Sequence, residues 1–339
     1  MDVPPPPPAP PRRRSGGVRR FAAVAACAAA ALLAACGDRG ERADLLRLGH
    51  FPNLTHAQAL VARHRARGGD AWLDRQLGAT VEWRVYNAGP GAMEALLSGE
   101  LDATWVGPNP ALNAHVRSRG EEVRVVAGAT WGGSALVVRA GAGVTSAADL
   151  RGKVVATPQL GNTQDVACRD WLLGHGLRAP VAGGGDVDVR PTANPEILSL
   201  FLRGDLAAAW TVEPWVSRLE TEGAGTLLVD DRESVTTVLV TTRRALEGRR
   251  DLVRRLVAAN DELSRWIAAH PTEAQAAVRD ELAALTRVET SAAVLARAWP
   301  RLAFRSDVDR AAFDAFAAAA TRTGLMERAP DLSRLVERP

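Results

Sequence analysis

The sequence predicts an α/β protein made of two lobes of similar structure. The first reason is that apolar strand patterns alternate with helical patterns along most of the chain. The second reason is an internal repeat, in which residues 87–105 match residues 192–210 without a gap, and residues 52–54 match residues 158–160. Ligands of open α/β sheets bind at the carboxyl ends of the strands, so we expect a ligand cleft between the lobes. Three aligned pairs mark the register of the repeat: Pro90 with Pro195, Gly99 with Gly204, and Trp105 with Trp210.

The first lobe begins after a polar segment and has a regular order of elements. Proline tolerates the first helical position because its missing N–H would be unpaired there, and glycine favours a helix end. Apolar spacing then predicts these elements in order: a strand over 46–50, a helix over 57–64 capped by Thr55, a short helix over 72–77, a strand over 81–86, a helix from Pro90 to Gly99, a strand over 101–106, a helix opened by Gly107-Pro108-Asn109-Pro110, and a strand over 123–127.

The second lobe repeats this order, and the chain then returns to the first lobe. The predicted elements are a strand over 134–139, a short helix over 147–152, a strand over 154–156, a helix from Val166, a strand over 188–190, a helix over 195–202, a strand over 206–210, a strand over 235–241, and helices from Asp251 to Gly324. We expect the strands over 134–139 and 235–241 to lie side by side as a two-strand hinge. The predicted limits are 45–135 and 238–339 for the first lobe, with the C-terminal helices packed on it, and 136–237 for the second.

One strand-to-helix loop, Thr157–Asp165, stands at the centre of the predicted cleft. It follows the apolar strand predicted over 154–156, and Asn162 or Thr163 is a suitable cap for the helix that starts there. Such a loop presents unpaired backbone N–H groups at the positive end of a helix dipole, which favours an anion. The alternative is an ordinary capped helix with no ligand.

The charge of the chain is concentrated in its leader. The formal net charge is +3, and residues 1–35 hold five arginines against Asp2, a local charge of +4, so 3 − 4 leaves −1 for the rest. The body has no clustered basic stripe, which argues against a nucleic-acid partner. Lys153 is the sole lysine. It lies five residues from the cleft end of its strand, roughly 16 Å at ~3.3 Å per residue, which argues against lysine chemistry.

Residues 1–35 predict a lipoprotein signal peptide. Arginines precede the apolar stretch Phe21–Ala35, which is too short to span a bilayer. Leu33-Ala34-Ala35-Cys36 resembles a bacterial lipobox, so we expect Cys36 to carry the lipid and residues 36–44 to form a tether. The segment 24–27 has the same pattern but too short an apolar stretch before it, and a plain signal peptide cut near Ala35 is the other alternative. The predicted location is the outer face of the cytoplasmic membrane, which is the periplasmic side if an outer membrane is present.

The sequence contains none of the common motifs of catalytic sites that we considered. The chain has no phosphate-binding glycine loop, no nucleophile elbow, no H-E-x-x-H and no C-x-x-C. His50, His56 and His115 are more simply hydrogen-bonding or packing residues than metal ligands. We therefore expect no catalytic residue, no metal site and no cofactor.

The predicted cleft is instead rich in neutral hydrogen-bonding groups. These are Asn53, Thr55, Asn87, Asn109, Ser134, Gln159, Asn162, Thr163 and Asn194. Trp105, Trp131, Trp210 and Trp215 are either core residues or apolar walls of the cleft, and Trp131 is the best candidate for a wall. Glu213 does not suit a simple anion site, and it either lies aside, pairs with an arginine, or binds the cationic end of a zwitterion.

Several motifs together resemble the aliphatic-sulfonate, taurine and nitrate group of ABC-transporter solute-binding proteins. They are Gly49-His50-Phe51-Pro52-Asn53-Leu54-Thr55-His56, Asn87-Ala88-Gly89-Pro90, Gly107-Pro108-Asn109-Pro110, Pro158–Asp165 and Glu213-Pro214-Trp215. The resemblance implies the type II periplasmic-binding fold and a membrane permease with a cytoplasmic ATPase as partner. We also expect a monomer without enzymatic activity. It also places His56, Gly89, Gly107, Gly161 and Trp131 in the ligand site beside the polar residues and Glu213.

The function that we expect from the sequence is binding of a small anionic or zwitterionic ligand, with an aliphatic sulfonate as the best candidate. Nitrate, bicarbonate, taurine and a thiamine-precursor pyrimidine remain alternatives. The family also has relatives that are pyrimidine-forming enzymes, but the leader and the position of Lys153 argue against that activity. A lipoprotein that senses its ligand for a partner is a third possibility.

Overall fold

A computed structural model describes residues 1, 5, 45–308 and 310–339. The predicted signal peptide, the lipid site at Cys36 and the tether up to Asp44 lie outside these residues. The described residues 45–308 and 310–339 belong to one compact unit.

The internal repeat becomes two sheets with the same internal strand order. The six-stranded sheet has the order β11-β4-β10-β3-β1-β2, and the five-stranded sheet has the order β7-β6-β8-β5-β9. Strands β1, β2 and β3 are parallel to one another, as are β6, β7 and β8, whereas β10 and β5 run antiparallel to their neighbours. The strands are β1 Leu45–His50, β2 Thr80–Val85, β3 Ala103–Val106, β4 Val123–Gly132, β5 Ser134–Val138, β6 Val154–Thr157, β7 Asp188–Pro191, β8 Ala208–Val212, β9 Thr226–Asp231, β10 Val235–Thr242 and β11 Leu302–Phe304.

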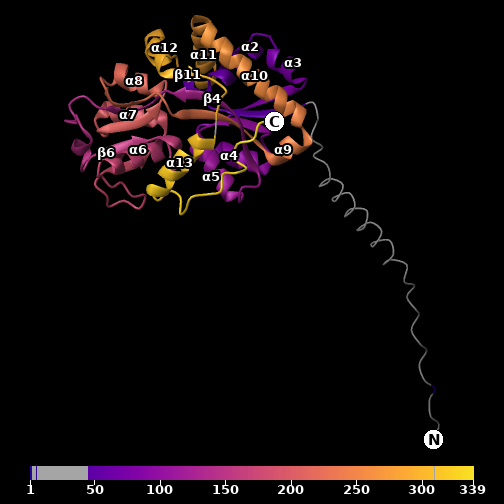
Figure 1. Ribbon diagram of the computed structural model, residues 1–339, viewed down its shortest axis with the longest axis horizontal. Helices are drawn as coiled ribbons and strands as arrows, with labels where there is room; N and C mark the ends of the chain where they lie inside the picture. Colours follow the sequence, from indigo (N-terminus) through magenta and orange to yellow (C-terminus); the bar gives the residue numbers. More distant parts are fainter. Residues whose placement is uncertain (2–4, 6–44, 309) are drawn as a thin grey trace. The chain divides into compact units, whose positions relative to one another are not determined.

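Helices lie on both faces of each sheet (Figure 1). The repeat predicts matching helix ends, and Gly99 and Gly204 do end α4 and α7 in the left-handed conformation. The α-helices are α2 Ala57–Arg67, α3 Trp72–Leu77, α4 Gly89–Ser98, α5 Pro108–Arg117, α6 Thr163–Gly174, α7 Asn194–Arg203, α8 Trp215–Glu222, α9 Arg243–Gly248, α10 Arg250–Ala269, α11 Pro271–Thr286, α12 Ala292–Ala298 and α13 Arg310–Arg322, with 3₁₀ turns η1 Leu54–His56, η2 Ala147–Leu150 and η3 Trp299–Arg301.

Alternation along the strands divides the apolar residues of each lobe between two faces. On β3, Trp105 packs with α2, α3, α10 and α11, whereas its neighbour Val106 packs with α4, α5 and α13. On β8, Trp210 faces α6, whereas Ala209 faces α7 and α8. A strand buried on both faces needs apolar residues at nearly every position, which explains the uninterrupted burial of these two strands.

The predicted pairing of the hinge strands is wrong. The strand β10 (Val235–Thr242) pairs with β4, and β5 (Ser134–Val138) pairs with β8 and β9 in the other sheet. Each sheet takes one antiparallel strand beside its central parallel strand, so β5 and β10 hold equivalent places in different lobes. The chain crosses between the sheets at residues 132–134 and again at residues 231–235.

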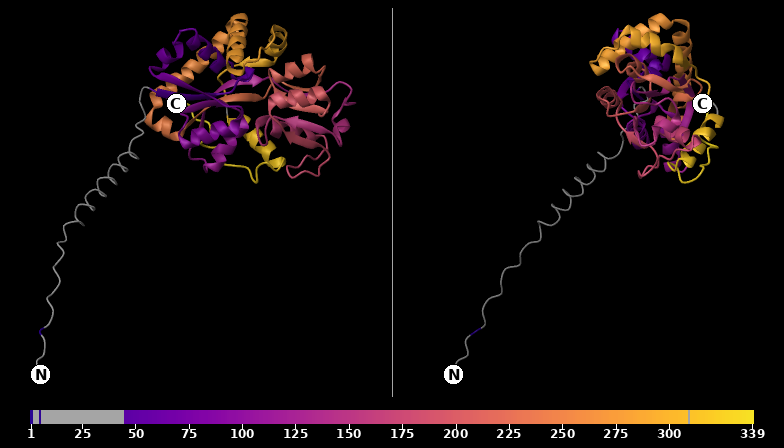
Figure 2. Two further views of the ribbon diagram at one scale, coloured as in Figure 1. Left: turned by 180° about the vertical axis from the view of Figure 1, so that it is seen from behind. Right: turned by 90° about the vertical axis from the view of Figure 1, so that its left-hand side faces the viewer.

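The C-terminal helices contact both lobes. As predicted, α10 and α11 pack against α2 of the first lobe. In addition, α12 packs against α8, and α13, coloured yellow, packs against α5 and α6 (Figure 2). Arg322 of α13 forms an ion pair with Asp170 of α6. Within residues 45–308 and 310–339, no helix combines the length and the apolar character needed to cross a bilayer.

Candidate functional site

The two lobes enclose a cavity of about 40 Å³ where the predicted cleft residues meet. Nine of the predicted site residues line it, and they come from both lobes. The lining residues are Phe51, Asn53, Thr55, His56, Asn87, Ala88, Gly89, Gly107, Pro110, Pro158, Asn162, Thr163, Gln164, Asn194, Val212 and Thr236.

Five helical segments begin at this cavity. The lining includes the first residues of η1, which leads into α2, and the first turn or cap of α4, α5, α6 and α7. The first N–H groups of a helix have no partner inside the helix, and the aligned peptide dipoles make that end positive. No aspartate, glutamate, lysine or arginine belongs to the lining. The cavity therefore combines an excess of hydrogen-bond donors with a positive potential that no side-chain charge supplies.

Direct contacts across the cavity hold the lobes in a closed arrangement. The backbone N–H of Asn109 donates to the hydroxyl of Thr163 (3.3 Å), and the side chain of Asn113 donates to the carbonyl of Gly161 (3.3 Å). On the opposite side, the backbone N–H of Leu54 donates to the carbonyl of Glu213 (3.1 Å). These bonds require the lobes to lie at contact distance.

Two glycines allow close contacts at the cavity, Gly107 between the lobes and Gly89 within the first lobe. A Cβ at Gly107 would lie 2.7 Å from the Thr163 hydroxyl, on the opposite lobe. A Cβ at Gly89 would lie 2.3 Å from the Pro110 ring, which joins the starts of α4 and α5. Gly107 has φ −67° and ψ 152°, a conformation open to any residue, so the close contact, and not the backbone, explains glycine there.

The loop Thr157–Asp165 has the predicted local structure. Asn162 caps α6, since its side-chain oxygen accepts from the backbone N–H of Asp165 (2.8 Å). The Asp165 carboxylate in turn accepts from the Thr157 hydroxyl, the Gly161 N–H and the Arg169 guanidinium at 2.9–3.1 Å. The loop is thereby fixed by its own side chains, which leaves Thr163 facing the other lobe. The predicted cap at Thr55 is wrong, because Thr55 lies inside η1.

Two buried histidines stand side by side in opposite tautomers. His56 accepts the backbone N–H of Phe51 at Nδ1 (3.4 Å), so its Nε2 carries the hydrogen. His50 donates from Nδ1 to the carbonyl of Phe51, and its Nε2 accepts from Arg63. Burial and the neighbouring Arg63 lower the pKa of His50 to about 3, and burial next to His50 places the pKa of His56 well below its ordinary value. His56 is thus a neutral donor in the cavity wall.

Two predicted amides beside the cavity are buried without hydrogen-bond partners. They are the side-chain nitrogen and oxygen of Asn109, which is 0% exposed, and the side-chain oxygen of Gln159. Buried amide groups normally have partners. Both residues adjoin lining residues, Asn109 next to Pro110 and Gln159 next to Pro158, so these groups are suited to a ligand or to the water around one.

Six predicted site residues do not line the cavity. Asn109, Gln159 and Gly161 adjoin it, whereas Trp131 packs under Arg305 and donates to the carbonyl of Asp307. Ser134 accepts from the indole of Trp210 (2.9 Å), and Glu213 pairs with Arg301. Of the other tryptophans, Trp105 and Trp210 are core residues, and Trp215 donates to Asn53.

The remaining seven lining residues were not among the predicted site residues. Pro110, Pro158 and Gln164 belong to motifs that the sequence analysis had assigned to the cleft. Their predicted neighbours in those motifs could therefore have indicated that these three residues line the cavity. Phe51, Ala88, Val212 and Thr236 have no polar signal or lie outside the motifs. Thr236 enters the lining because β10 pairs with β4 near the crossing between lobes.

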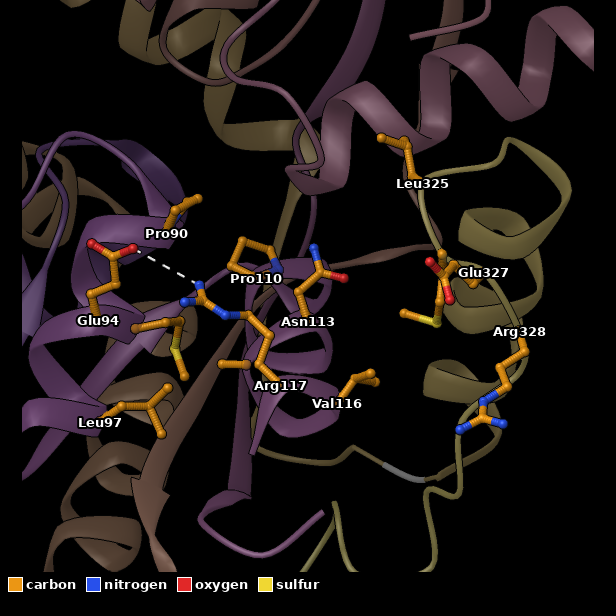
Figure 3. Close-up of a pocket in the computed structure, with 13 residues that line it drawn as sticks. Pro90, Glu94, Leu97, Pro110, Asn113, Val116, Arg117, Leu325, Glu327 and Arg328 are labelled. Carbon is orange, nitrogen blue, oxygen red and sulfur yellow. Dashed lines mark ion pairs between the residues drawn. The ribbon is translucent and has the colours of Figure 1, made fainter. Parts of the chain in front are cut away.

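A larger hollow, of about 500 Å³, lies on the first lobe between α4, α5 and residues 325–328 (Figure 3). It contains none of the predicted site residues. Its charged residues are exposed, including Glu94 and Arg117, which lie 3.8 Å apart with 67% and 68% of their side chains exposed. Exposed pairs of this kind contribute little, so the smaller buried cavity is the better candidate site. No group of three metal-ligating side chains occurs in the described part of the chain.

Comparisons with known proteins agree with this geometry. The NMT1-like family matches residues 39–285. Over 152 residues the chain is 29% identical to the taurine-binding periplasmic protein of Escherichia coli (strain K12), a match that covers 44% of each protein. The chain thus spans less than half the length of this curated relative.

Solved structures show the same fold at low identity. The alkanesulfonate-binding protein SsuA from Xanthomonas axonopodis pv. citri, bound to MOPS, superposes with a TM-score of 0.71 at 19% identity, covering 87% of this chain and 99% of that one. The periplasmic nitrate-binding protein NrtA from Synechocystis PCC 6803 superposes with a TM-score of 0.72 at 13% identity, covering 87% and 86%. These matches confirm the predicted two-lobed α/β fold. Because the family match spans most of the chain, this protein belongs to the NMT1-like family.

Proposed function

We propose that this chain is the exported solute-binding protein of an ABC importer, and that it binds a small oxyanion, best an aliphatic sulfonate, in the interlobe cavity. The observation that carries the proposal is the ring of five helical N-termini around a cavity without charged side chains. In this proposal the protein delivers its ligand to a membrane permease that works with a cytoplasmic ATPase.

The donors in the cavity match the chemistry of a sulfonate. A sulfonate oxygen only accepts hydrogen bonds, and N–H donors at helix starts favour an anion by ~0.3–1 kcal/mol each. Thr163 and His56 add side-chain donors, and the unpartnered nitrogen of Asn109 adds another. Several such contacts, shielded from water, give an anion site that needs no lysine or arginine.

Closure of the lobes is the proposed binding mechanism. The ligand contacts α4 and α5 from the first lobe and α6 and α7 from the second, so it stabilises the closed arrangement over an open one. We propose that the two lobes move as units close to the predicted limits, 45–135 with 238–339 and 136–237, except that β5 stays whole in the second lobe and β10 stays whole in the first. The crossings near Gly132–Gly133 and Arg232–Ser234 then serve as hinges.

The names of the relatives support binding of an oxyanion and favour a binding protein over an enzyme. They are named as binding proteins for taurine, alkanesulfonate and nitrate. Nitrate is the second candidate for this chain, because a cavity of about 40 Å³ is small beside the ~300–1,000 Å³ of drug-sized sites.

We also propose that Cys36 carries a lipid that holds the protein on the outer face of the cytoplasmic membrane. The support is the sequence Leu33-Ala34-Ala35-Cys36 after a basic and then apolar leader. Intact-mass analysis of membrane-extracted protein tests this proposal. Loss of residues 1–35 with a diacylglycerol-sized addition supports it, and an unmodified Cys36 contradicts it.

Thermal unfolding against a ligand panel tests the binding proposal. The panel holds ethanesulfonate, taurine, nitrate, bicarbonate, sulfate and a hydroxymethyl-pyrimidine. A ligand at 100 times its Kd adds about 2.7 kcal/mol to the free energy of unfolding, a shift of a few degrees. A shift with ethanesulfonate supports the proposal. A shift with the pyrimidine alone, or with no oxyanion, contradicts it.

A further inference from the structure

Two buried carboxyl groups adjoin the cavity in sequence, yet neither lines it. Asp165 follows the lining residue Gln164, and Glu213 follows the lining residue Val212. Both side chains are 0% exposed. A carboxylate is the natural partner of a ligand's ammonium group. The orientation of these two groups therefore bears on whether the ligand can be a zwitterion.

Asp165 is fully engaged within its own loop. Its oxygens accept from Thr157, Gly161 and Arg169, all within eight residues. The buried Arg169 neutralises it, and the pair is 3% and 0% exposed. This carboxylate stabilises the loop and has no free oxygen to offer a ligand.

Glu213 is turned away from the cavity by a residue from a distant part of the chain. One carboxylate oxygen accepts from the Arg301 guanidinium (2.7 Å) and the Ser217 hydroxyl (2.9 Å), and the other accepts from the Ser217 N–H (3.1 Å). Arg301 lies 88 residues along the chain in η3, directly before β11 of the six-stranded sheet. A second bond, to Glu220 (2.7 Å), fixes the guanidinium.

The backbone of Glu213 nevertheless lies at the cavity wall. Its carbonyl accepts from Leu54, next to the lining residue Asn53, and Val212 precedes it. The backbone of Glu213 therefore adjoins the cavity, whereas its side chain is bonded to Arg301 and Ser217 and does not line it. Burial raises the pKa of Glu213, and the bonds from Arg301 and Ser217 oppose that rise, so Arg301 also favours the ionised form in its turned-away position.

We infer that Arg301 is a specificity-determining residue, which holds the Glu213 carboxylate away from the interlobe cavity and thereby restricts the site to oxyanions without an ammonium group. This inference rests on the proposed function and narrows its substrate class. An ammonium group inside the cavity would lose its water and meet no carboxylate, and it would also face the positive ends of the helices.

Isethionate and taurine separate the two classes, because they differ by a hydroxyl in place of an ammonium group. Titration calorimetry with the purified protein should give isethionate a Kd at least about 100-fold below that of taurine, as expected for an unpaired buried cation. Equal binding of the two ligands by the unaltered protein overturns the inference and leaves the proposed oxyanion function intact. If neither binds, the inference is overturned, and the proposed function then depends on whether another oxyanion of the panel stabilises the protein.

Variants test the role of Arg301 itself. Arg301→Met should narrow the preference for isethionate over taurine at least about tenfold, because Glu213 loses its cationic partner and keeps only the two bonds from Ser217. Glu213→Gln/Arg301→Met should restore the preference. Glu213→Gln alone should leave the preference unchanged. Arg124→Met is the matched control, since Arg124 is a buried arginine (4% exposed) that pairs with Glu337 away from the cavity. If Arg301→Met and Arg124→Met prefer isethionate over taurine to the same degree, Arg301 does not determine specificity. The result with unaltered protein remains decisive if Arg301→Met does not fold.

Discussion

Gly107→Ala should prevent full closure of the lobes without affecting the open protein. The new Cβ would lie 2.7 Å from the Thr163 hydroxyl on the opposite lobe, and its next contact is an ordinary 3.6 Å to Pro110. The backbone conformation suits alanine, so no strain arises within the first lobe. Thr163 can escape only by giving up its bond to the N–H of Asn109. The cost therefore falls on the closed, ligand-bound state.

The size of the effect follows from the contact. Forcing an extra methyl group into a packed site costs about 1–3 kcal/mol, which weakens ligand binding by about 5- to 150-fold. Thr163→Ala alone removes the bond from the Asn109 N–H and a donor to the ligand, worth about 1 kcal/mol each, so binding weakens by about 5- to 30-fold. In the double variant the added Cβ meets only ordinary contacts, with Pro110 at 3.6 Å and the Cβ at position 163 at 3.7 Å. Gly107→Ala/Thr163→Ala should therefore bind about as well as Thr163→Ala.

Titration calorimetry with ethanesulfonate, or with whichever oxyanion stabilises the protein, measures this cycle. Gly174→Ala is the control, because a Cβ there meets nothing within 4 Å. We expect the losses of binding free energy in the two single variants to be strongly non-additive in the double variant. Additive losses, or unchanged affinity in Gly107→Ala, would refute the claim that these residues meet in the bound state.

Three further predictions concern stability and pH. The pKa of His50 is about 3, against 6.5 ordinarily, so the unfolded chain binds more protons than the folded protein between these two pH values. The free energy of unfolding should therefore fall as the pH drops below about 6.5, by up to ~1.4 kcal/mol per pH unit. Urea unfolding at pH 5.5 and 7.5 should show a larger loss for the unaltered protein than for His50→Gln, and equal losses would contradict this prediction. Asn162→Ala removes a helix cap and should lower the free energy of unfolding by about 1 kcal/mol, whereas no loss in urea unfolding would mean that the cap is unimportant. Arg301→Met leaves Glu213 buried without a cation and should lower the free energy of unfolding by about 3–5 kcal/mol. Glu213→Gln/Arg301→Met should recover most of that loss in urea unfolding. A double variant as unstable as Arg301→Met would argue against the ion pair.

Local patterns predicted the fold and the loops of the site well. The repeat predicted two lobes because the same strand, turn and helix signals recur about 105 residues apart, as with Gly99 and Gly204. Asn162 was recognisable as a cap because capping depends on neighbours three residues away. Nine predicted residues surround one cavity because strand-to-helix loops of both lobes end there.

Long-range pairing could not be predicted in the same way. Nothing in the β-branched strand Val235–Thr242 distinguishes β4 from β5 as its partner, since both candidates are buried along their length. The position of Glu213 depends on Arg301, 88 residues away in a helical region without a motif. Trp131 was expected in the cavity wall, but its place is set by Arg305 and Asp307, which enter through the β11 segment.

A crystal structure of the protein with ethanesulfonate would show where the anion binds. We expect sulfonate oxygens in the interlobe cavity, within hydrogen-bond distance of donors at the starts of α4, α5, α6 and α7, with Thr163 and Asn109 still in contact. A sulfonate bound instead in the larger hollow between α4, α5 and residues 325–328 (Figure 3) would contradict this expectation, as would a cavity holding no ligand at saturating concentration.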